Sequence, residues 1–367
     1  MKIGIILEPY EEVNASGIAL CILNQMEGLS SISDEDKFIV YSSRPLDKKR
    51  TRKNIKNIII PKSFLGKEIR LIKDYFLNKE VPDVILFNMP LLPIVLPKKI
   101  KTIPVFYELI YQSPSGLSLK RRVFILLQKL LTKIVIKRSP VIITPSKSIK
   151  KDIVSHYNID SDKIKPIYIG FQEFIPSISK KIVDKPYFIF LGKIKYKKNI
   201  HNMVDGFIRF KKEKSTNHKF ILLGDYNDKD KYFREIRDKI EINNLGTDIL
   251  FFGYVNNKDE IYNYYINSGG LVFATLQEGF GMPIIEAMRL SVPVITSSRA
   301  PMNEVSGGAA FLVDPEEPES IKNAFIDIVE NKDKVEKMKN KGLEWSKNFS
   351  WDLHNKELFK IIKSYEK

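Results

Sequence analysis

Short apolar runs alternate with amphipathic stretches along the whole chain, and this alternation restricts the fold more than any other feature of the sequence. Runs such as 84–87 and 187–191 have the length and the β-branched or aromatic content of buried strands. Between them apolar residues recur at helical spacing, as over 17–29. Alternation of this kind indicates a parallel sheet covered on both faces. The sequence therefore predicts an α/β chain built from doubly wound parallel sheets.

The same pattern predicts the individual elements. Strands are expected at 1–7, 38–41, 58–60, 84–87, 102–107, 141–144, 187–191, 219–223, 248–252, 269–275, 292–296 and 310–313. Helices are expected at 17–29, 147–157, 200–212, 231–243, 258–267, 284–290, 319–331, 335–348 and 351–365, with a loop between 296 and 310. Ser146 is the predicted N-cap of the helix at 147–157.

The alternation breaks once, in the Pro- and Ser-containing segment 175–186. A chain of 367 residues is too long for one typical domain and fits two domains of about 150–200 residues each. We therefore predict an N-terminal Rossmann-like domain at 1–172, a linker at 173–186 and a C-terminal Rossmann-like domain at 187–349.

Composition narrows the class of protein. No apolar stretch reaches the roughly 18 residues that a membrane-spanning helix requires, and the first seven residues are too few for the apolar core of a signal peptide. Cys21 is the single cysteine, so no intramolecular disulfide can form. The four histidines do not cluster, and no metal-ligand spacing is present. We expect a cytoplasmic protein that works without a metal ion, with the cytoplasmic face of the membrane as an alternative location.

The net charge of +16 is concentrated in the first half of the chain. Residues 1–172 contain 29 basic and 16 acidic side chains, whereas residues 173–367 contain 31 and 28. The segment 117–139 has seven basic residues, no acidic one, and apolar residues at helical spacing. It fits two descriptions, a helix on an anionic membrane surface or a buried helix with a basic exposed face. Nucleic acid is not expected as a partner, because no recognition motif is present.

A strand, a glycine-rich loop and a helix meet at 269–290, and two carboxylates flank the loop. Glu278 and Glu286 stand eight positions apart around Gly-Phe-Gly-Met-Pro, and Pro283 suits a first helical turn. A helix that begins at such a loop presents free N–H groups to an anion. By spacing alone, the segment is equally compatible with an ordinary strand-to-helix turn that carries two solvated glutamates.

Several separated motifs, in the right order, resemble the retaining glycosyltransferases of family 4. In the second half these are G-K-I-K-Y-K-K-N at 192–199, F-F-G-Y-V at 251–255, E-G-F-G-M-P-I-I-E at 278–286, and P-M-N-E-V followed by L-V-D-P at 301–315. In the first half they are Ser16-Gly17-Ile18 after the first strand and I-Y-I-G at 167–170. The resemblance implies the GT-B fold, in which two Rossmann-like domains face each other across a cleft. It also implies that the last helix, 350–367, packs back on the N-terminal domain.

The resemblance implies a reaction and its residues. A hexose would pass, with retention of configuration, from a nucleotide diphosphate sugar (GDP- or UDP-linked) to a saccharide acceptor. Lys193, which stands where the family usually has Arg, and Lys198 would neutralise the leaving diphosphate. Glu278 would face the donor sugar and Glu286 the ribose hydroxyls. The other donor contacts would be Gly17, Gly253, Gly279, Phe280, Gly281, Met282 and Pro283.

One departure concerns the family's His-Asp pair near the donor sugar, which matches Tyr107 and Glu108 in this chain. Both are expected as sugar or acceptor contacts, although a strand end with a capping acid would look the same. The basic first half suggests a lipid-linked acceptor, such as a polyprenyl-diphosphate saccharide, in the assembly of a cell-surface glycan. A degenerate relative that binds nucleotide without transferring sugar is the alternative, motivated by the substitutions at Tyr107 and Lys193.

Overall fold

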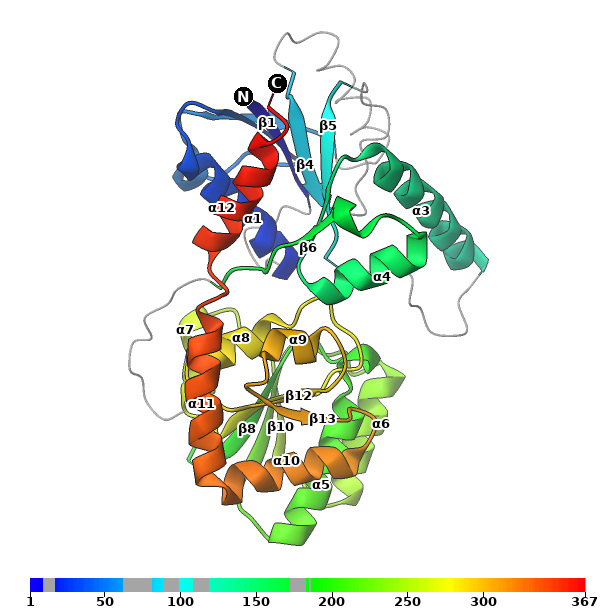
Figure 1. The fold of residues 1–367 in the computed structure, drawn as a ribbon. Helices are drawn as coiled ribbons and strands as arrows, with labels where there is room; N and C mark the ends of the chain where they lie inside the picture. Colours follow the sequence, from blue (N-terminus) through cyan, green and yellow to red (C-terminus); the bar gives the residue numbers. More distant parts are fainter. Residues whose placement is uncertain are drawn as a thin grey trace. The chain divides into compact units, whose positions relative to one another are not determined.

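The computed structural model describes residues 1–8, 17–61, 81–88, 99–107, 119–171, 183–184 and 186–366, without the side chains of 119–121 and 124. These form two compact units, drawn in Figure 1. Unit 1 contains Met1–Gly170 and Phe349–Lys367, and unit 2 contains Phe171–Asn348. Most of the linker expected at 173–186 lies outside the described residues.

Unit 1 is built on a parallel sheet of seven strands in the order β3-β2-β1-β4-β5-β6-β7. The strands are β1 (Lys2–Leu7), β2 (Lys37–Ser42), β3 (Ile55–Ile59), β4 (Val84–Asn88), β5 (Lys101–Val105), β6 (Ile142–Thr144) and β7 (Ile164–Pro166). All five residues of β4 are buried, as expected for a strand covered on both faces. The helices are α1 (Gly17–Ile32), α3 (Leu119–Arg138), α4 (Lys147–Tyr157) and α12 (Trp351–Lys363), with short 3₁₀ turns at Lys48–Arg50 and Ser161–Lys163.

The core of unit 1 fixes which side of α3 is buried. Val135 packs in a cluster with residues of β1, β2 and β4, and Ile136 packs in a second cluster with β6 and α4. Both α3 side chains are almost fully buried. Within the described part of the structure, the opposite side of α3 is therefore exposed to solvent. Among the described helices, none is long and apolar enough to cross a membrane.

Unit 2 is built on a second parallel sheet, of six strands in the order β10-β9-β8-β11-β12-β13. The strands are β8 (Tyr187–Leu191), β9 (Lys219–Leu223), β10 (Ile249–Gly253), β11 (Gly270–Phe273), β12 (Val294–Ser297) and β13 (Phe311–Val313). The helices are α5 (Ile200–Lys214), α6 (Lys231–Ile242), α7 (Lys258–Ile266), α8 (Met282–Arg289), α9 (Met302–Ser306), α10 (Pro318–Glu330) and α11 (Lys332–Ser346), with a 3₁₀ turn at Tyr196–Lys198. Two parallel Rossmann-like sheets confirm the predicted fold class.

The predicted elements match the observed ones closely where the periodic run is long. Helix α4 and strands β8 and β9 have the predicted bounds, and the Ser146 side chain caps α4 by accepting from the Ile149 N–H at 3.1 Å. The prediction of a loop between β12 and β13 was wrong, because α9 lies there. Its single apolar face consists of Met302 and Val305, and a helix of five residues is too short to show a repeating pattern. Strand β7, with three residues, was missed for the same reason.

Helix α12 returns to unit 1 and lies against α1 (Figure 1), and it makes two close contacts with glycines, one with Gly28 of α1 and one with Gly170 after β7. A Cβ atom at Gly28 would stand 1.9 Å from Asn355 Nδ2, and one at Gly170 would stand 2.3 Å from the Trp351 backbone nitrogen. Glycine is therefore required at Gly170, where the obstacle is backbone, whereas at Gly28 a larger residue would have to displace the Asn355 side chain. The start of α12 is consequently held by the backbone at Gly170, and its packing on α1 by side chains.

Candidate functional site

Two glycines hold the loops at the carboxyl ends of β8 and β9 against each other. Gly192 and Gly224 have φ values of +150° and +151°, which side chains rarely adopt. A Cβ atom at Gly224 would stand 1.9 Å from the Gly192 carbonyl oxygen, and the Gly192 N–H donates to the Leu223 carbonyl at 2.8 Å. The G-K-I-K-Y-K-K-N segment therefore leaves the sheet along a path that requires glycine in both loops.

Lys198 and Glu278 form an ion pair at the carboxyl edge of the unit 2 sheet. Lys198 ends the 3₁₀ turn Tyr196–Lys198, and Glu278 lies in the loop between β11 and α8. The two side chains are only 16% and 12% exposed. The Lys198 Nζ atom also lies 5.3 Å from the centre of the Phe273 ring. Two residues that are 80 positions apart are thus brought together in a sparsely hydrated place, where charges interact more strongly than in water.

Asn199 fixes this pair by joining three loops. Its side chain is fully buried, and its Nδ2 atom donates to the carbonyl oxygens of Ala274 at 2.8 Å and Pro315 at 2.6 Å. The backbone adds a second connection, because the Leu276 N–H donates to the Lys197 carbonyl at 3.0 Å. The Lys-Asn ending of the motif therefore has two separate tasks: the lysine supplies charge and the asparagine supplies geometry.

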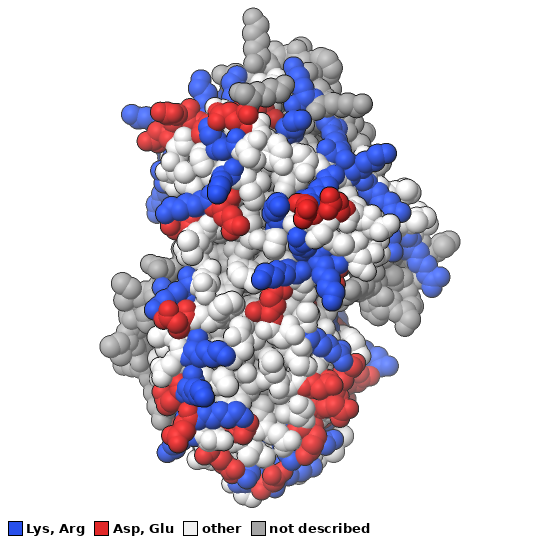
Figure 2. Space-filling view, viewed as in Figure 1, with Lys and Arg blue, Asp and Glu red and all other residues white. Residues whose placement is uncertain are grey.

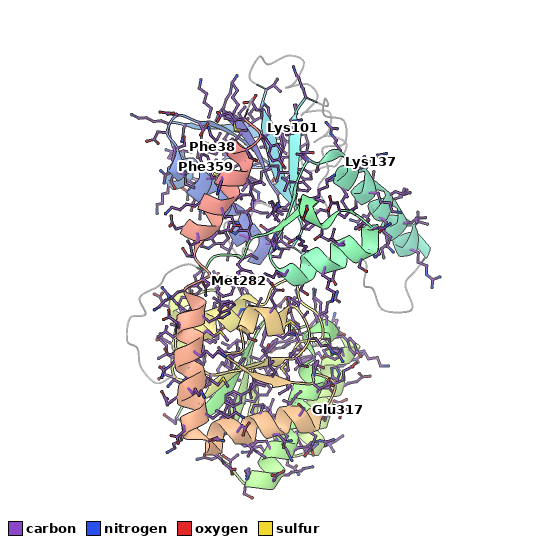
Figure 3. All side chains as sticks on the ribbon, viewed as in Figure 1. Phe38, Lys101, Lys137, Met282, Glu317 and Phe359 are labelled. Carbon is purple, nitrogen blue, oxygen red and sulfur yellow. The ribbon has the colours of Figure 1, made fainter. Side chains whose placement is uncertain are left out.

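The glycine-rich loop opens directly into α8, as predicted. Gly281 is the N-cap residue with φ +99°, and a proline occupies the first turn. Met282, labelled in Figure 3, is the first helical residue. The first N–H groups of a helix have no partner within the helix and carry partial positive charge. Pro283 has no N–H, and the Ile284 N–H donates to the Gly281 carbonyl at 3.0 Å, so the Met282 N–H is the donor that the first residue of α8 offers to an anion beside Glu278.

Glu286 lies in the fifth position of α8 and accepts a hydrogen bond from the Tyr265 hydroxyl, at 3.2 Å from Oε2. Burial raises the pKa of Glu286, and the bond from Tyr265 partly opposes that shift. Burial and the neighbouring carboxylate also raise the pKa of Tyr265, so the phenol keeps its proton. Tyr265 was not identified from the sequence, since nothing in the spacing links it to Glu286.

Lys193 has a different partner from Lys198. Its Nζ atom lies 2.6 Å from Asp225 Oδ2, and both side chains are more than half exposed. Gly253, at the end of β10, has φ +71°, and the register of β10 with β9 shifts next to it. The structure therefore brings Lys198 and Glu278 together, whereas Lys193 pairs with Asp225 in the loop that follows β9.

The predicted residues of unit 1 are only partly described. Gly17 is the first residue of α1, and a Cβ atom there would meet nothing within 4 Å. Tyr107 follows β5 and is 6% exposed, and its hydroxyl lies 3.4 Å from Gln25 Oε1. Glu108 lies outside the described residues. Asn88, at the end of the neighbouring strand β4, is buried and was not identified from the sequence.

Comparison with known proteins assigns unit 2 to a family. Residues 171–345 match the family model described as "Glycosyl transferases group 1". The chain is 30% identical over 214 residues to the O-antigen chain mannosyltransferase RfbU of Salmonella typhimurium, covering 58% of this chain and 57% of that protein. It is 26% identical over 244 residues to an N-acetylgalactosamine-N,N'-diacetylbacillosaminyl-diphospho-undecaprenol 4-alpha-N-acetylgalactosaminyltransferase of Campylobacter jejuni, covering 65% and 64%. The match thus spans less than two thirds of the length of each of these relatives.

Solved structures agree over the whole length of the fold. A sucrose-phosphate synthase from Thermosynechococcus elongatus is similar with a TM-score of 0.78 and 17% identity, covering 99% of this chain and 98% of that one. The Anabaena protein Alr3699/HepE, solved in complex with UDP and glucose, is similar with a TM-score of 0.75 and 15% identity, covering 99% and 100%. Residues 171–345 thus match the glycosyl transferases group 1 family, and the chain has the GT-B fold.

Proposed function

We propose that this chain transfers a hexose from a nucleotide diphosphate sugar to a saccharide acceptor during the assembly of a cell-surface glycan. The observation that carries the proposal is the Lys198–Glu278 pair beside the first turn of α8. A leaving diphosphate needs positive charge and N–H donors at the place where its negative charge develops. Lys198 supplies the charge, and the Met282 N–H at the start of α8 supplies a donor. Lys193 adds a further cation from an exposed loop.

In the proposed reaction the sugar keeps its anomeric configuration. The bond between the anomeric carbon and the diphosphate oxygen breaks, and a bond to the acceptor hydroxyl forms on the same face. The proton of that hydroxyl passes to an oxygen of the departing diphosphate. Glu278 binds sugar hydroxyls and stabilises the positive charge that develops at the anomeric carbon. Under this scheme the protein works mainly by positioning and by electrostatics, and no metal ion is required.

Glu286 is proposed to hold the ribose of the nucleotide. Tyr265 already occupies Oε2 of the carboxylate, so the remaining lone pairs can accept from the two neighbouring ribose hydroxyls. Two such bonds would favour the charged carboxylate and offset the effect of burial. Gly253 would leave the backbone at the end of β10 open to the base.

A lipid-linked acceptor at a membrane surface is supported by α3. Five apolar side chains of this helix are between 48% and 59% exposed: Val123, Leu126, Leu127, Leu130 and Ile134. Their spacing places them on one side, opposite to the buried Val135 and Ile136. Arg122, Lys129, Lys133 and Lys137 border this apolar stripe. On the face drawn in Figure 2, Lys and Arg gather over α3 and α4, and Lys137 is labelled in Figure 3.

This combination fits an anionic bilayer better than it fits water. Apolar side chains can enter the headgroup boundary while the basic side chains meet anionic lipids, each contributing about 1 kcal/mol near the surface. The relative from Campylobacter jejuni carries diphospho-undecaprenol in its name, which supports a polyprenyl-diphosphate saccharide as the acceptor here. A peripheral position at the cytoplasmic face of the membrane follows from the proposal.

The membrane contact is tested by co-sedimentation with phosphatidylglycerol vesicles. Leu130→Asp is expected to weaken binding by roughly thirtyfold, because about 2 kcal/mol of apolar burial is lost. Leu353→Asp is the matched control, since Leu353 on α12 is equally exposed at 53% and lies outside the stripe. It should bind like the unchanged protein. The membrane role of α3 would be rejected if both variants lost vesicle binding equally. It would also be rejected if the unchanged protein bound phosphatidylcholine vesicles as well as phosphatidylglycerol vesicles.

The transfer activity is tested by a thermal-shift screen of nucleoside diphosphates and their sugars, followed by transfer assays with the stabilising donor. A nucleotide present at a hundredfold excess over its dissociation constant should stabilise the protein by about 2.7 kcal/mol. We expect both a shift and turnover of the sugar. A shift with one nucleotide but no turnover with any of its sugars would favour the alternative, a nucleotide-binding relative without transfer activity.

A further inference from the structure

A chain of buried hydrogen bonds in unit 1 links α12 to the residue that follows β5. His354 of α12, Gln25 of α1 and Tyr107 are 3%, 1% and 6% exposed. His354 Nδ1 lies 2.8 Å from the Tyr168 carbonyl oxygen, and His354 Nε2 lies 3.0 Å from Gln25 Nε2. Gln25 Oε1 lies 3.4 Å from the Tyr107 hydroxyl. Residues from four distant parts of the sequence therefore form one connected network.

One carbonyl group determines the direction of every bond in this network. The Tyr168 carbonyl can only accept, so His354 Nδ1 carries a proton and donates it. Burial lowers the pKa of His354 to about 4, which keeps the ring neutral and leaves Nε2 as an acceptor. The Gln25 amide nitrogen therefore donates to Nε2, and its oxygen faces Tyr107. The Tyr107 hydroxyl donates its single proton to that oxygen.

Tyr107 consequently has no proton left for a ligand. The sequence suggested that Tyr107 would contact a sugar or the acceptor, but its proton is already used on Gln25. Burial raises the pKa of Tyr107, so the phenol stays protonated and the bond keeps its direction. Only the lone pairs of the phenolic oxygen remain, and these accept.

The same edge of the sheet has a second group with unused hydrogen-bonding capacity. Asn88 ends β4 and lies next to Val105 of β5 in the parallel register. It is 3% exposed, and its Oδ1 atom has no hydrogen-bond partner among the described residues. Buried polar atoms are normally satisfied, so an orphaned acceptor at the strand end next to β5 points to a ligand that donates. The carboxyl edge of a parallel sheet is also where such folds bind ligands.

We propose that Gln25 and His354 are positioning residues, which hold the Tyr107 hydroxyl as a hydrogen-bond acceptor for a hydroxyl group of the bound saccharide. This inference rests on the proposed sugar transfer. With Asn88, the edge would then offer two acceptors, Tyr107 Oη and Asn88 Oδ1, to a substrate rich in O–H donors. It would discriminate against a saccharide in which the contacted hydroxyl is replaced by hydrogen or by an ether.

The network itself is tested by ¹⁵N NMR of the histidine rings, which requires no activity. We expect His354 to be neutral with the proton on Nδ1, and the Nε2 resonance to move when Gln25 is replaced by Met. A proton on Nε2 would overturn the assigned directions. Histidine resonances are identified by the loss of one signal in His354→Gln.

The positioning role is tested by a double-mutant cycle on kcat/KM. Tyr107→Phe is expected to lower kcat/KM roughly tenfold, and Gln25→Met roughly threefold to tenfold, because each removes an oriented hydrogen bond. In the Tyr107→Phe background, Gln25→Met should have no further effect on kcat/KM. A purely structural role would instead give the same loss in both backgrounds, and that result would overturn the proposal.

His354 provides a rescue experiment. His354→Leu removes the acceptor for Gln25 and should behave like Gln25→Met, whereas His354→Gln keeps an acceptor near Nε2 and should retain most of the activity. Equal losses in the two His354 variants, at equal thermal stability, would also contradict the proposal. A protein that transfers no sugar but shows the Nδ1-protonated ring would reject the proposed function and, with it, the role of Tyr107, while the network would stand.

Discussion

Glu278→Gln is expected to lower sugar transfer by at least about a hundredfold while leaving nucleoside diphosphate binding nearly unchanged. Oriented charge at a developing transition state is typically worth a factor of this size. Lys198→Gln should lower transfer to a similar extent and should also weaken nucleoside diphosphate binding, because its charge acts on the diphosphate. Binding is measured by calorimetry and transfer with the donor found by thermal shift. The two variants thus separate the sugar side of the pair from the phosphate side.

Each variant leaves one charge of a partly buried pair without its partner, which by itself can destabilise a protein. The matched control is Lys211→Gln, since the pair of Lys211 and Asp248 in the same unit is 12% and 19% exposed, close to the values for Lys198 and Glu278. It should lose comparable thermal stability and keep its transfer activity. If both Glu278→Gln and Lys198→Gln transfer sugar within threefold of the unchanged protein, the site has been assigned wrongly.

Of the glycine-to-alanine substitutions in unit 2, Gly224→Ala should be the most destabilising. The new Cβ would stand 1.9 Å from the Gly192 carbonyl oxygen at φ +151°, so one of the two loops must move. Strained backbone and overpacking each cost about 1–3 kcal/mol, which predicts a loss of roughly 2–6 kcal/mol in the free energy of unfolding. Because the displaced loop carries Lys193 and leads to Lys198, nucleotide binding should weaken as well.

Two other glycines separate the cost of backbone strain from the cost of the steric clash. Gly253 has φ +71°, but a Cβ atom there would meet nothing within 4 Å. Gly253→Ala therefore measures backbone strain alone. Gly246 has neither a close neighbour nor such a φ value, so Gly246→Ala should change the free energy of unfolding by no more than about 0.5 kcal/mol. In urea unfolding, the loss in the free energy of unfolding should be largest for Gly224→Ala, smaller for Gly253→Ala and smallest for Gly246→Ala. Equal losses at Gly224 and Gly253 would show that the clash is relieved without cost.

The alternation of strands and helices was sufficient to predict the fold, because each sheet is buried on both faces and its strands are continuous apolar runs. The elements that were missed are those too short to repeat, β7 and α9. In the site, the resemblance identified Lys198 and Glu278, which the structure pairs. Spacing alone had left the Glu278 loop as compatible with an ordinary turn.

The sequence could not predict contacts between residues that become neighbours only after folding. Asp225 holds Lys193, and Tyr265 holds Glu286, yet no motif connects either pair. His354 was noted only as one of four scattered histidines, because 329 positions separate it from Gln25. Local patterns report local structure, and these contacts depend on which strand ends and helices become neighbours after folding.

The return of α12 to unit 1 has a consequence for biosynthesis. The middle of the chain, Phe171–Asn348, forms a contiguous unit that can fold as soon as it leaves the ribosome. Unit 1 is completed only when α12 is available, since α12 packs against α1 and carries His354. A chain that lacks the residues after Asn348 would therefore keep all of unit 2 and lack the helix that completes unit 1.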